Sequence, residues 1–296
     1  MSDAASTAKP VPVPAARRGK NALLRVLSEP LGLLGALLVL LALLGAALAG
    51  FLAPDPIAMA PIDRFLPPSL DHLLGTDNLG RDLFARVLYG GRIALLVSLG
   101  STGVSLILGL AAGLVAGYGP RWLDSLLLLI FDALKSFPTV MLALALVTLL
   151  GPSEWAVVLV VIVANAPSYA RMARTQTMSL RHAQFVEAER SLGAGIGRII
   201  ATHILPNIVG PILIVASMDI PVVIAIEAGM CFLGLGVRPP TPAWGSILES
   251  GFEYIQDSPW AVIAGGLPII ITTLGFTFLG EALRDTFDPK LSSGPR

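Results

Sequence analysis

Hydrophobic runs long enough to cross a bilayer alternate with short polar segments along this chain. Residues 31–53 carry no charged side chain over 23 positions. As a helix this run would be about 34 Å long, enough to cross ~30 Å of hydrocarbon. Five further apolar runs follow, at residues 93–118, 126–150, 155–170, 208–237 and 260–283. The pattern predicts an all-α integral membrane protein with six transmembrane helices.

Charged residues interrupt two of these runs. The third run contains Asp132 and Lys135, and the fifth contains Asp219 and Glu227. A charge in hydrocarbon costs at least ~2.5 kcal/mol on insertion scales, so it usually faces the bundle interior or a partner. Asp132 and Lys135 are three positions apart on one helix and can neutralise each other. Asp219 and Glu227 are candidates to line a passage, or they only set helix packing, and both interpretations stay open.

Composition supports the membrane class and excludes several others. Hydrophobic residues make up 54% of the chain, charged residues 14%, and the mean hydropathy is +0.78; soluble domains carry about a quarter charged residues. The formal net charge of zero argues against a nucleic-acid partner. The sequence contains no G-x-x-x-x-G-K-[ST] phosphate loop, and its His and single Cys fit no metal-ligand spacing. We expect no cofactor, no metal and no catalysis by this chain.

The distribution of basic residues predicts an orientation. With the N-terminus inside, 14 of the 20 Lys and Arg residues fall in cytoplasmic segments, five in the opposite loops, and Lys135 within a span. Residues 1–30 are predicted to be a disordered cytoplasmic tail, and 291–296 a second one. Residues 54–92 become the large extracytoplasmic loop, and 171–207 becomes a cytoplasmic loop. Both termini are expected in the cytoplasm.

The 171–207 loop has a helical pattern of its own. Apolar residues recur at three- and four-residue steps, at Phe185, Ala188, Leu192, Ile196 and Ile199. Gly193 and two further glycines predict a bend or a break into two short helices. Pro206 predicts a stop before the fifth span. The periodicity alone favours an amphipathic surface helix that only caps the bundle.

The residues of this loop also carry a resemblance. Glu187, Ala188 and Glu189, followed by Leu192, Gly193, Leu205 and Pro206, resemble the EAA loop of ABC importer permeases. Residues 72–98, 232–248 and 283–290 match, in the same order, segments of the shorter permease of dipeptide, oligopeptide and nickel importers. One position departs from the pattern, because Glu189 stands where the loop normally has alanine.

The resemblance implies a type I ABC importer permease fold, with residues 93–290 as a core of five transmembrane helices. It also implies that the chain forms half of a passage for peptides or related small solutes in the bacterial inner membrane. The expected partners are a homologous permease subunit in a heterodimer, two ATPase subunits docked on the EAA loop, and an extracytoplasmic substrate-binding protein. The competing hypothesis is a self-sufficient secondary transporter or channel that uses Asp132, Asp219 and Glu227 as ion sites.

The 54–92 loop supports two interpretations. Prolines exclude a long helix from its first part, whereas the stretch from Asp77 onward is compatible with helix. Asp82 and Arg86 form an i,i+4 pair. Asp77, Gly80, Arg81 and Asp82 either form a surface near which the substrate-binding protein docks, or they build a structural lid on the core.

Overall fold

The computed structural model describes residues 22–287, and its regular elements are helices. In chain order these are α1 (Ala22–Ser28), α2 (Pro30–Leu52), the 3-10 turn η1 (Pro61–Asp63), α3 (Leu83–Tyr118), α4 (Arg121–Lys135), α5 (Thr139–Leu150), α6 (Glu154–Leu180), α7 (Gln184–Ser191), α8 (Ile196–Ile199), the π-helical turn η2 (Ile200–Ile204), α9 (Leu205–Phe232), α10 (Trp244–Glu253) and α11 (Trp260–Phe287).

Five helical segments of residues 22–287 are long and apolar enough to cross a membrane. They are α2, α3, α6, the continuous stretch Ile196–Phe232, and Trp260–Thr286. The pair α4 and α5 also passes when taken together, but its two helices meet at an angle of 91°. Counting this bent pair as one span gives the six predicted helices. The all-α membrane fold is confirmed, with one span sharply broken.

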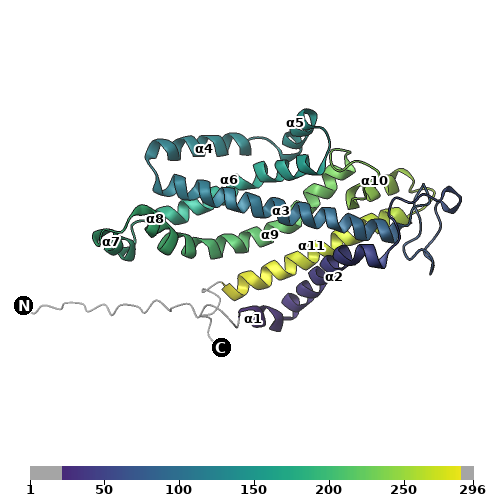
Figure 1. The fold of residues 1–296 in the computed structure, drawn as a ribbon, viewed down its shortest axis with the longest axis horizontal. Coiled ribbons are helices and arrows are strands. Elements are labelled where there is room, and N and C mark those ends of the chain that lie inside the picture. Colours follow the sequence, from purple (N-terminus) through teal and green to yellow (C-terminus); the bar gives the residue numbers. More distant parts are fainter. Residues whose placement is uncertain (1–21, 288–296) are drawn as a thin grey trace, which may run out of the picture.

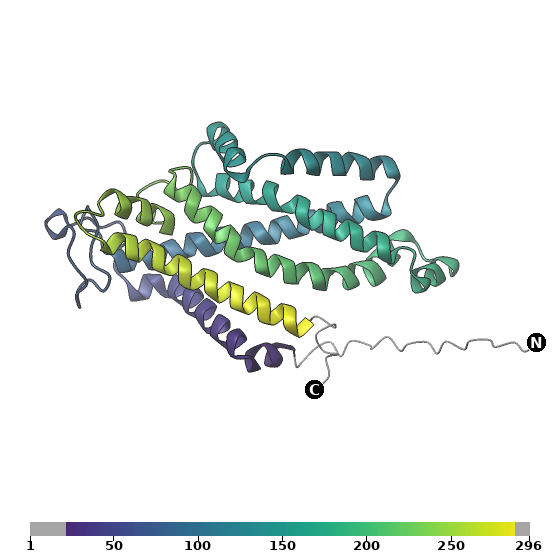
Figure 2. The ribbon, with the colours of Figure 1, turned by 180° about the vertical axis from the view of Figure 1, so that it is seen from behind.

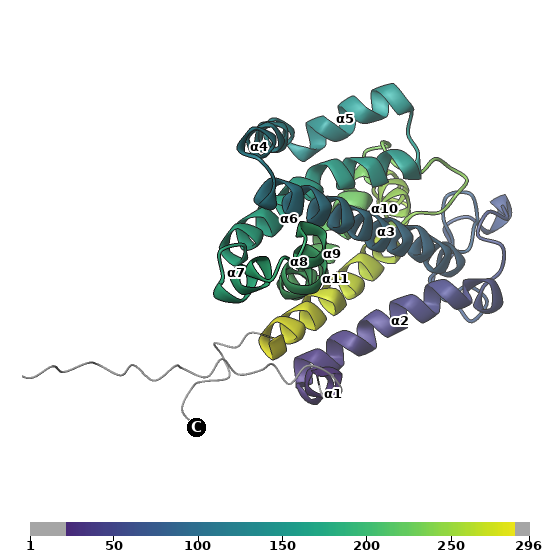
Figure 3. The same cartoon turned by 60° about the vertical axis from the view of Figure 1, so that its left-hand side comes forward.

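The long helices run along a common axis and separate two ends of the molecule (Figure 1). The α7–α8 segment, residues 184–199, lies at one end. The segment of residues 53–82 and α10 lie at the other end, as the reverse view also shows (Figure 2). Helices α4 and α5 form an outer arm beyond α6, whereas α2 and α11 run side by side on the opposite side (Figure 3).

Small residues allow the central helices to approach closely. A Cβ added at Gly109 would lie 2.6 Å from the Tyr169 Cβ, and one added at Gly113 would lie 2.4 Å from the Ala170 carbonyl oxygen. Close packing of this kind is a usual basis of helix association in membranes. Lipid is as apolar as the helices, so there is no hydrophobic driving force between them. The α3–α6 pair is therefore a rigid centre against which the other elements are placed.

Two predicted boundaries were wrong near the N-terminal half. Residues 22–28, expected within a disordered tail, form α1, because Val26 is buried next to Gly32 of α2. The predicted 54–92 loop ends earlier, because α3 already begins at Leu83. Asp82 is its N-cap and accepts a hydrogen bond of 2.7 Å from the Ala85 N–H. Residues 1–21 and the predicted tail 291–296 lie outside the described residues.

The 171–207 loop is also shorter than predicted. Helix α6 continues through Pro167 to Leu180, and α9 already begins at Leu205. The predicted stop at Pro206 was wrong, since η2 leads directly from α8 into α9. Pro206 follows the π-helical turn η2, and this wider turn adjusts the hydrogen-bond ladder just before the proline.

Candidate functional site

Two buried side chains anchor the α7–α8 segment, and the apolar pattern of the sequence included only one of them, Ile199. Val186 and Ile199 are buried in a cluster with Tyr169 of α6 and Ile204 and Ile208 near the start of α9. The rest of the predicted apolar face points outward: Phe185, Ala188, Leu192 and Ile196 are exposed, and Leu192 is 84% exposed. These apolar positions therefore do not share one buried face, because the chain breaks between the two helices.

The break lies at Gly193, as predicted. Its φ is +84°, a left-handed conformation that glycine adopts without strain. The Gly193 N–H donates to the Arg190 carbonyl (3.0 Å) and the Ala194 N–H to the Glu189 carbonyl (3.0 Å), which closes the end of α7. The family-like residues Glu187, Ala188 and Glu189 thus stand on a short helix with a fixed end.

Arginines fasten this segment to the ends of neighbouring helices. Arg190 Nη2 donates to the Tyr118 hydroxyl at the end of α3 (3.1 Å). Arg181 Nη1, just after α6, donates to the Gly117 carbonyl (3.0 Å). About two turns earlier, Arg174 forms a bidentate ion pair with Asp124 of α4, with Nη2 to Oδ2 at 2.7 Å. Sequence reasoning missed these contacts, since no spacing along the chain links residues 50 to 72 positions apart.

Glu189, at the position that departs from the EAA pattern, reaches the next element. Its Oε1 lies 3.4 Å from His203 Nε2 in η2. The His203 ring also packs 6.0 Å, centroid to centroid, from the Phe185 ring. The two side chains of this pair are each about one-third exposed. Leu205 and Pro206 follow at once in the first turn of α9. The structure therefore brings Glu189 and the Leu205-Pro206 pair to the same end of the bundle.

At the opposite end, Asp77 organises the residues that precede α3. Its Oδ1 accepts hydrogen bonds from the Leu79 and Arg81 N–H groups (2.9 and 3.0 Å). Its Oδ2 accepts one from Arg81 Nε (2.7 Å) and lies 3.6 Å from Arg86 Nε. All three charged side chains are buried. The structure gives Arg86 an ion pair with Asp77 in place of the predicted one with Asp82, which is occupied as the N-cap.

Asp82 and Gly80 complete this arrangement. The second carboxylate oxygen of Asp82 lies 2.9 Å from His72 Nδ1. Gly80 has a φ of +70°, and a Cβ there would lie 1.8 Å from the Ala60 carbonyl oxygen. The four residues selected from the sequence, Asp77, Gly80, Arg81 and Asp82, thus meet in one compact buried cluster. Their burial favours the structural interpretation for these side chains themselves.

The acidic residue of the third span is not paired as predicted. Asp132 Oδ1 lies 3.3 Å from Arg171 Nη1 on α6, so its ion pair is not with Lys135. Both partners are largely exposed, which makes the pair weak. Asp132 stands near the corner where α4 meets α5.

The two acidic residues of α9 lie in different surroundings. Asp219 is half-buried and accepts a hydrogen bond from the Tyr169 hydroxyl (2.8 Å). Glu227 is fully buried; its Oε1 accepts from the Cys231 thiol (3.2 Å), and its Oε2 has no partner among the described residues. A buried oxygen without a partner is costly, which marks Glu227 as a position of strain on the helix that follows the α7–α8 segment.

Known proteins resemble this chain over most of its length. The model of the "binding-protein-dependent transport system inner membrane component" family matches residues 109–293. The dipeptide transport system permease protein DppC of Alkalihalophilus pseudofirmus is 38% identical and covers 93% of this chain and 90% of its own. The glutathione transport system permease protein GsiD of Pectobacterium atrosepticum is also 38% identical, over 91% and 90%.

A solved structure shares the fold. An inward-facing form of the MetNI methionine ABC transporter aligns with a TM-score of 0.52 at 17% identity, covering 69% of this chain and 97% of the other. The low identity limits this likeness to the fold, which is that of a type I importer permease. Together with the family match and the relatives, it shows that the chain belongs to the inner-membrane permease subunits of binding-protein-dependent ABC importers, in the dipeptide and oligopeptide group.

Proposed function

We propose that this chain forms half of the passage of a peptide importer and is driven by two ATPase subunits that dock on the α7–α8 segment. A homologous permease supplies the other half, and an extracytoplasmic binding protein delivers the substrate. The proposed substrate class follows from relatives whose names state dipeptide, di/tripeptide and glutathione transport. Small peptides, including glutathione-like ones, are the class common to these names.

The observation that carries the proposal is an exposed apolar surface on a firmly held helix. Phe185, Leu192 and Ile196 are exposed at the end of the bundle, although α7 also carries several charged residues. Burial of one such side chain by a partner contributes about 1.5–3 kcal/mol. Val186 and the Arg190–Tyr118 hydrogen bond hold the same helix to the core. A partner that covers this surface can therefore push on the bundle rather than move a loose loop.

The connection to the passage runs through η2. Helix α8 continues through this turn into α9 without a break in the helical path. Glu189 contacts His203 in η2, so a displacement of α7 is passed to the start of α9. Helix α9 carries Asp219 and Glu227, and a tilt of α9 changes what surrounds both. Closure of the ATPases would in this way open the passage to the binding protein, and hydrolysis would reset it.

At the opposite end, the binding protein is proposed to dock on exposed side chains of the 53–82 segment and not on its charged cluster. The cluster around Asp77 is buried, so it cannot itself contact a partner. It holds the surrounding loop in one conformation, on which exposed side chains such as Ile62 and Leu70 are displayed. In this arrangement the α7–α8 end and both termini lie in the cytoplasm, as the basic residues predict.

The test is substrate-stimulated ATP hydrolysis by the chain co-expressed with candidate ATPase and permease subunits in nanodiscs. Glu187→Arg and Gly193→Pro are expected to abolish the stimulation, or to release the ATPase from the complex. Glu249→Arg, an exposed change on α10 at the other end of the bundle, is the matched control and is expected to retain the ATPase.

Two outcomes would count against the proposal. If both α7–α8 variants hydrolyse ATP and transport like the wild type, the segment is not the docking site. If the chain alone moves substrate into vesicles without any ATPase, the secondary transporter gains support. In that case Asp132→Asn, Asp219→Asn and Glu227→Gln should each be tested for loss of transport.

A further inference from the structure

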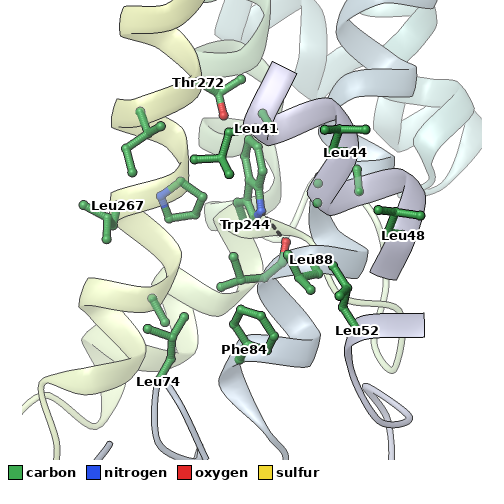
Figure 4. A pocket seen from close by; sticks show the side chains of 18 residues that line it. Leu41, Leu44, Leu48, Leu52, Leu74, Phe84, Leu88, Trp244, Leu267 and Thr272 are labelled. Atoms are coloured by element: carbon green, nitrogen blue, oxygen red, sulfur yellow. Dashed lines mark hydrogen bonds between the residues drawn. The ribbon is translucent and has the colours of Figure 1, made fainter. Parts of the chain in front are cut away.

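An apolar groove of about 430 Å³ lies between α2, α3, α10 and α11 (Figure 4). Leucines 41, 44 and 48 of α2 form one wall, Leu88 of α3 and Leu267 of α11 form others, and Trp244 of α10 forms its floor. The groove is remote from the α7–α8 segment and plays no part in the function proposed above.

The walls offer no free polar group to a ligand. Only two lining residues, Trp244 and Thr272, have polar side-chain atoms. The indole N–H of Trp244 already donates to the Val87 carbonyl (2.8 Å), and Thr272 is buried. A bound water needs two to four polar partners, so water is a poor occupant. A peptide or other polar solute is excluded for the same reason.

The mouth of the groove opens toward hydrocarbon. Both α2 and α11 are long and apolar enough to span the membrane, and α2 is the least buried of the spans among residues 22–287. Leu41, Leu44 and Leu48 line the groove and are at the same time exposed on the surface of α2. These positions belong to the second half of α2, which ends at Leu52. The groove therefore lies in the leaflet next to the 53–82 segment.

We infer that this groove binds one acyl chain of a membrane phospholipid. An empty groove of this size would leave its lining atoms without dispersion contacts, which close-packed interiors avoid. A transmembrane helix, about 10–12 Å wide with its side chains, is much bulkier than a single hydrocarbon chain. A single hydrocarbon chain is narrow, flexible and apolar throughout, so it matches the walls. The acyl chain would fill the wedge between α2 and α11 and cover the walls of the groove, Trp244 among them.

Trp244 provides the test, because it lines the groove but is only 3% exposed. We would prepare the full chain with its partner subunits in nanodiscs of phosphatidylcholine whose acyl chains are brominated. The other three tryptophans would be replaced by phenylalanine. A second single-tryptophan chain would keep only Trp155, which is 69% exposed, as the control for ordinary lipid contact.

Bromine quenches indole fluorescence only at contact, so an acyl chain in the groove should quench Trp244 about as strongly as Trp155. Gly45→Phe would fill the groove, since a Cβ there meets only the flexible end of Leu88, and should remove the quenching. Ala47→Phe, on the exposed side of α2 away from the groove, should not. Quenching of Trp155 alone would overturn the inference. So would Trp244 quenching that persists in Gly45→Phe, because the bromine would then reach it by another path.

Discussion

The two ends of this bundle are built in opposite ways. At the 53–82 end, charged side chains turn inward, and the buried Asp77 carboxylate pairs with both Arg81 and Arg86. At the α7–α8 end, apolar side chains turn outward, and the polar contacts of α7, Arg190 with Tyr118 and Glu189 with His203, involve partly exposed residues. The charged cluster of the first end is satisfied within the chain, whereas the α7–α8 segment exposes apolar side chains that a partner could cover. Stability should therefore depend mainly on the cluster, and binding of the ATPases on the α7–α8 segment.

The largest effect is expected when the carboxylate at the centre of the buried cluster is removed. Asp77→Ala leaves the Arg81 and Arg86 guanidinium groups buried without their carboxylate partner, and we expect a loss of about 3–5 kcal/mol in the free energy of unfolding. Denaturation of the purified chain in detergent would measure it. Asp132→Ala, which breaks only the exposed pair with Arg171, should cost less than ~1 kcal/mol. Equal losses in the two variants would contradict the contrast.

A smaller effect is expected at the end of α7. Gly193→Ala forces a side chain into a left-handed backbone conformation, at a cost of roughly 1–2 kcal/mol. Gly195→Ala is the matched control, because both positions open into free space but Gly195 has a φ of −68°. Hydrogen exchange of the α7 amides should accelerate in the first variant only. Identical exchange in the two would show that the turn does not depend on its glycine.

The contact between Glu189 and His203 should be weaker still. Glu189→Ala is expected to cost at most ~1 kcal/mol, since the pair is partly exposed. Substrate-stimulated hydrolysis should nevertheless fall, because the contact links α7 to η2. A double-mutant cycle with His203→Ala separates the pair from its surroundings. Strictly additive losses in hydrolysis would mean that the two side chains do not act together.

The smallest effect on the free energy of unfolding is expected for Leu192→Ala, although this variant should clearly weaken binding of the ATPase. Leu192→Ala removes an 84% exposed side chain, so the free energy of unfolding should stay within about 0.5 kcal/mol. The amount of ATPase that copurifies with the chain should drop. Leu149→Ala, at an 82% exposed position on α5, serves as control and should retain the ATPase. A similar loss in both variants would indicate general damage instead of a docking surface.

The features that follow from local chemistry were predictable from the sequence. The spans appear as uncharged runs because hydrocarbon excludes charge, and the break at Gly193 follows from the freedom of glycine at positive φ. The stretch from Asp77 onward was expected to be compatible with helix, but its continuity with the second span from Leu83 was not predicted, although Asp82 is a good N-cap residue. A hydrophobic run shows only where a helix meets lipid, and α3 extends beyond that region by a turn or more.

Pairings between distant residues were beyond sequence reasoning. Asp132 was predicted to pair with Lys135 because they are neighbours on one helix, yet Arg171 of α6 is its partner. The same holds for Val186, which has no special place in the apolar pattern but is buried against α6 and α9. Which of several similar side chains is buried depends on the packing of neighbouring helices, and no single segment contains that information.

The corner between α4 and α5 limits what can surround it in the membrane. Residues 136–138 turn the chain by 91° between α4 and α5, which together form a broken span or a re-entrant loop. Lipid cannot solvate non-helical backbone, so such a turn is stable only against protein or water. Phe137 at this corner is nevertheless exposed on the isolated chain. We therefore expect that bulk lipid does not contact this corner in the membrane. Another subunit or a water-filled cavity should contact it instead.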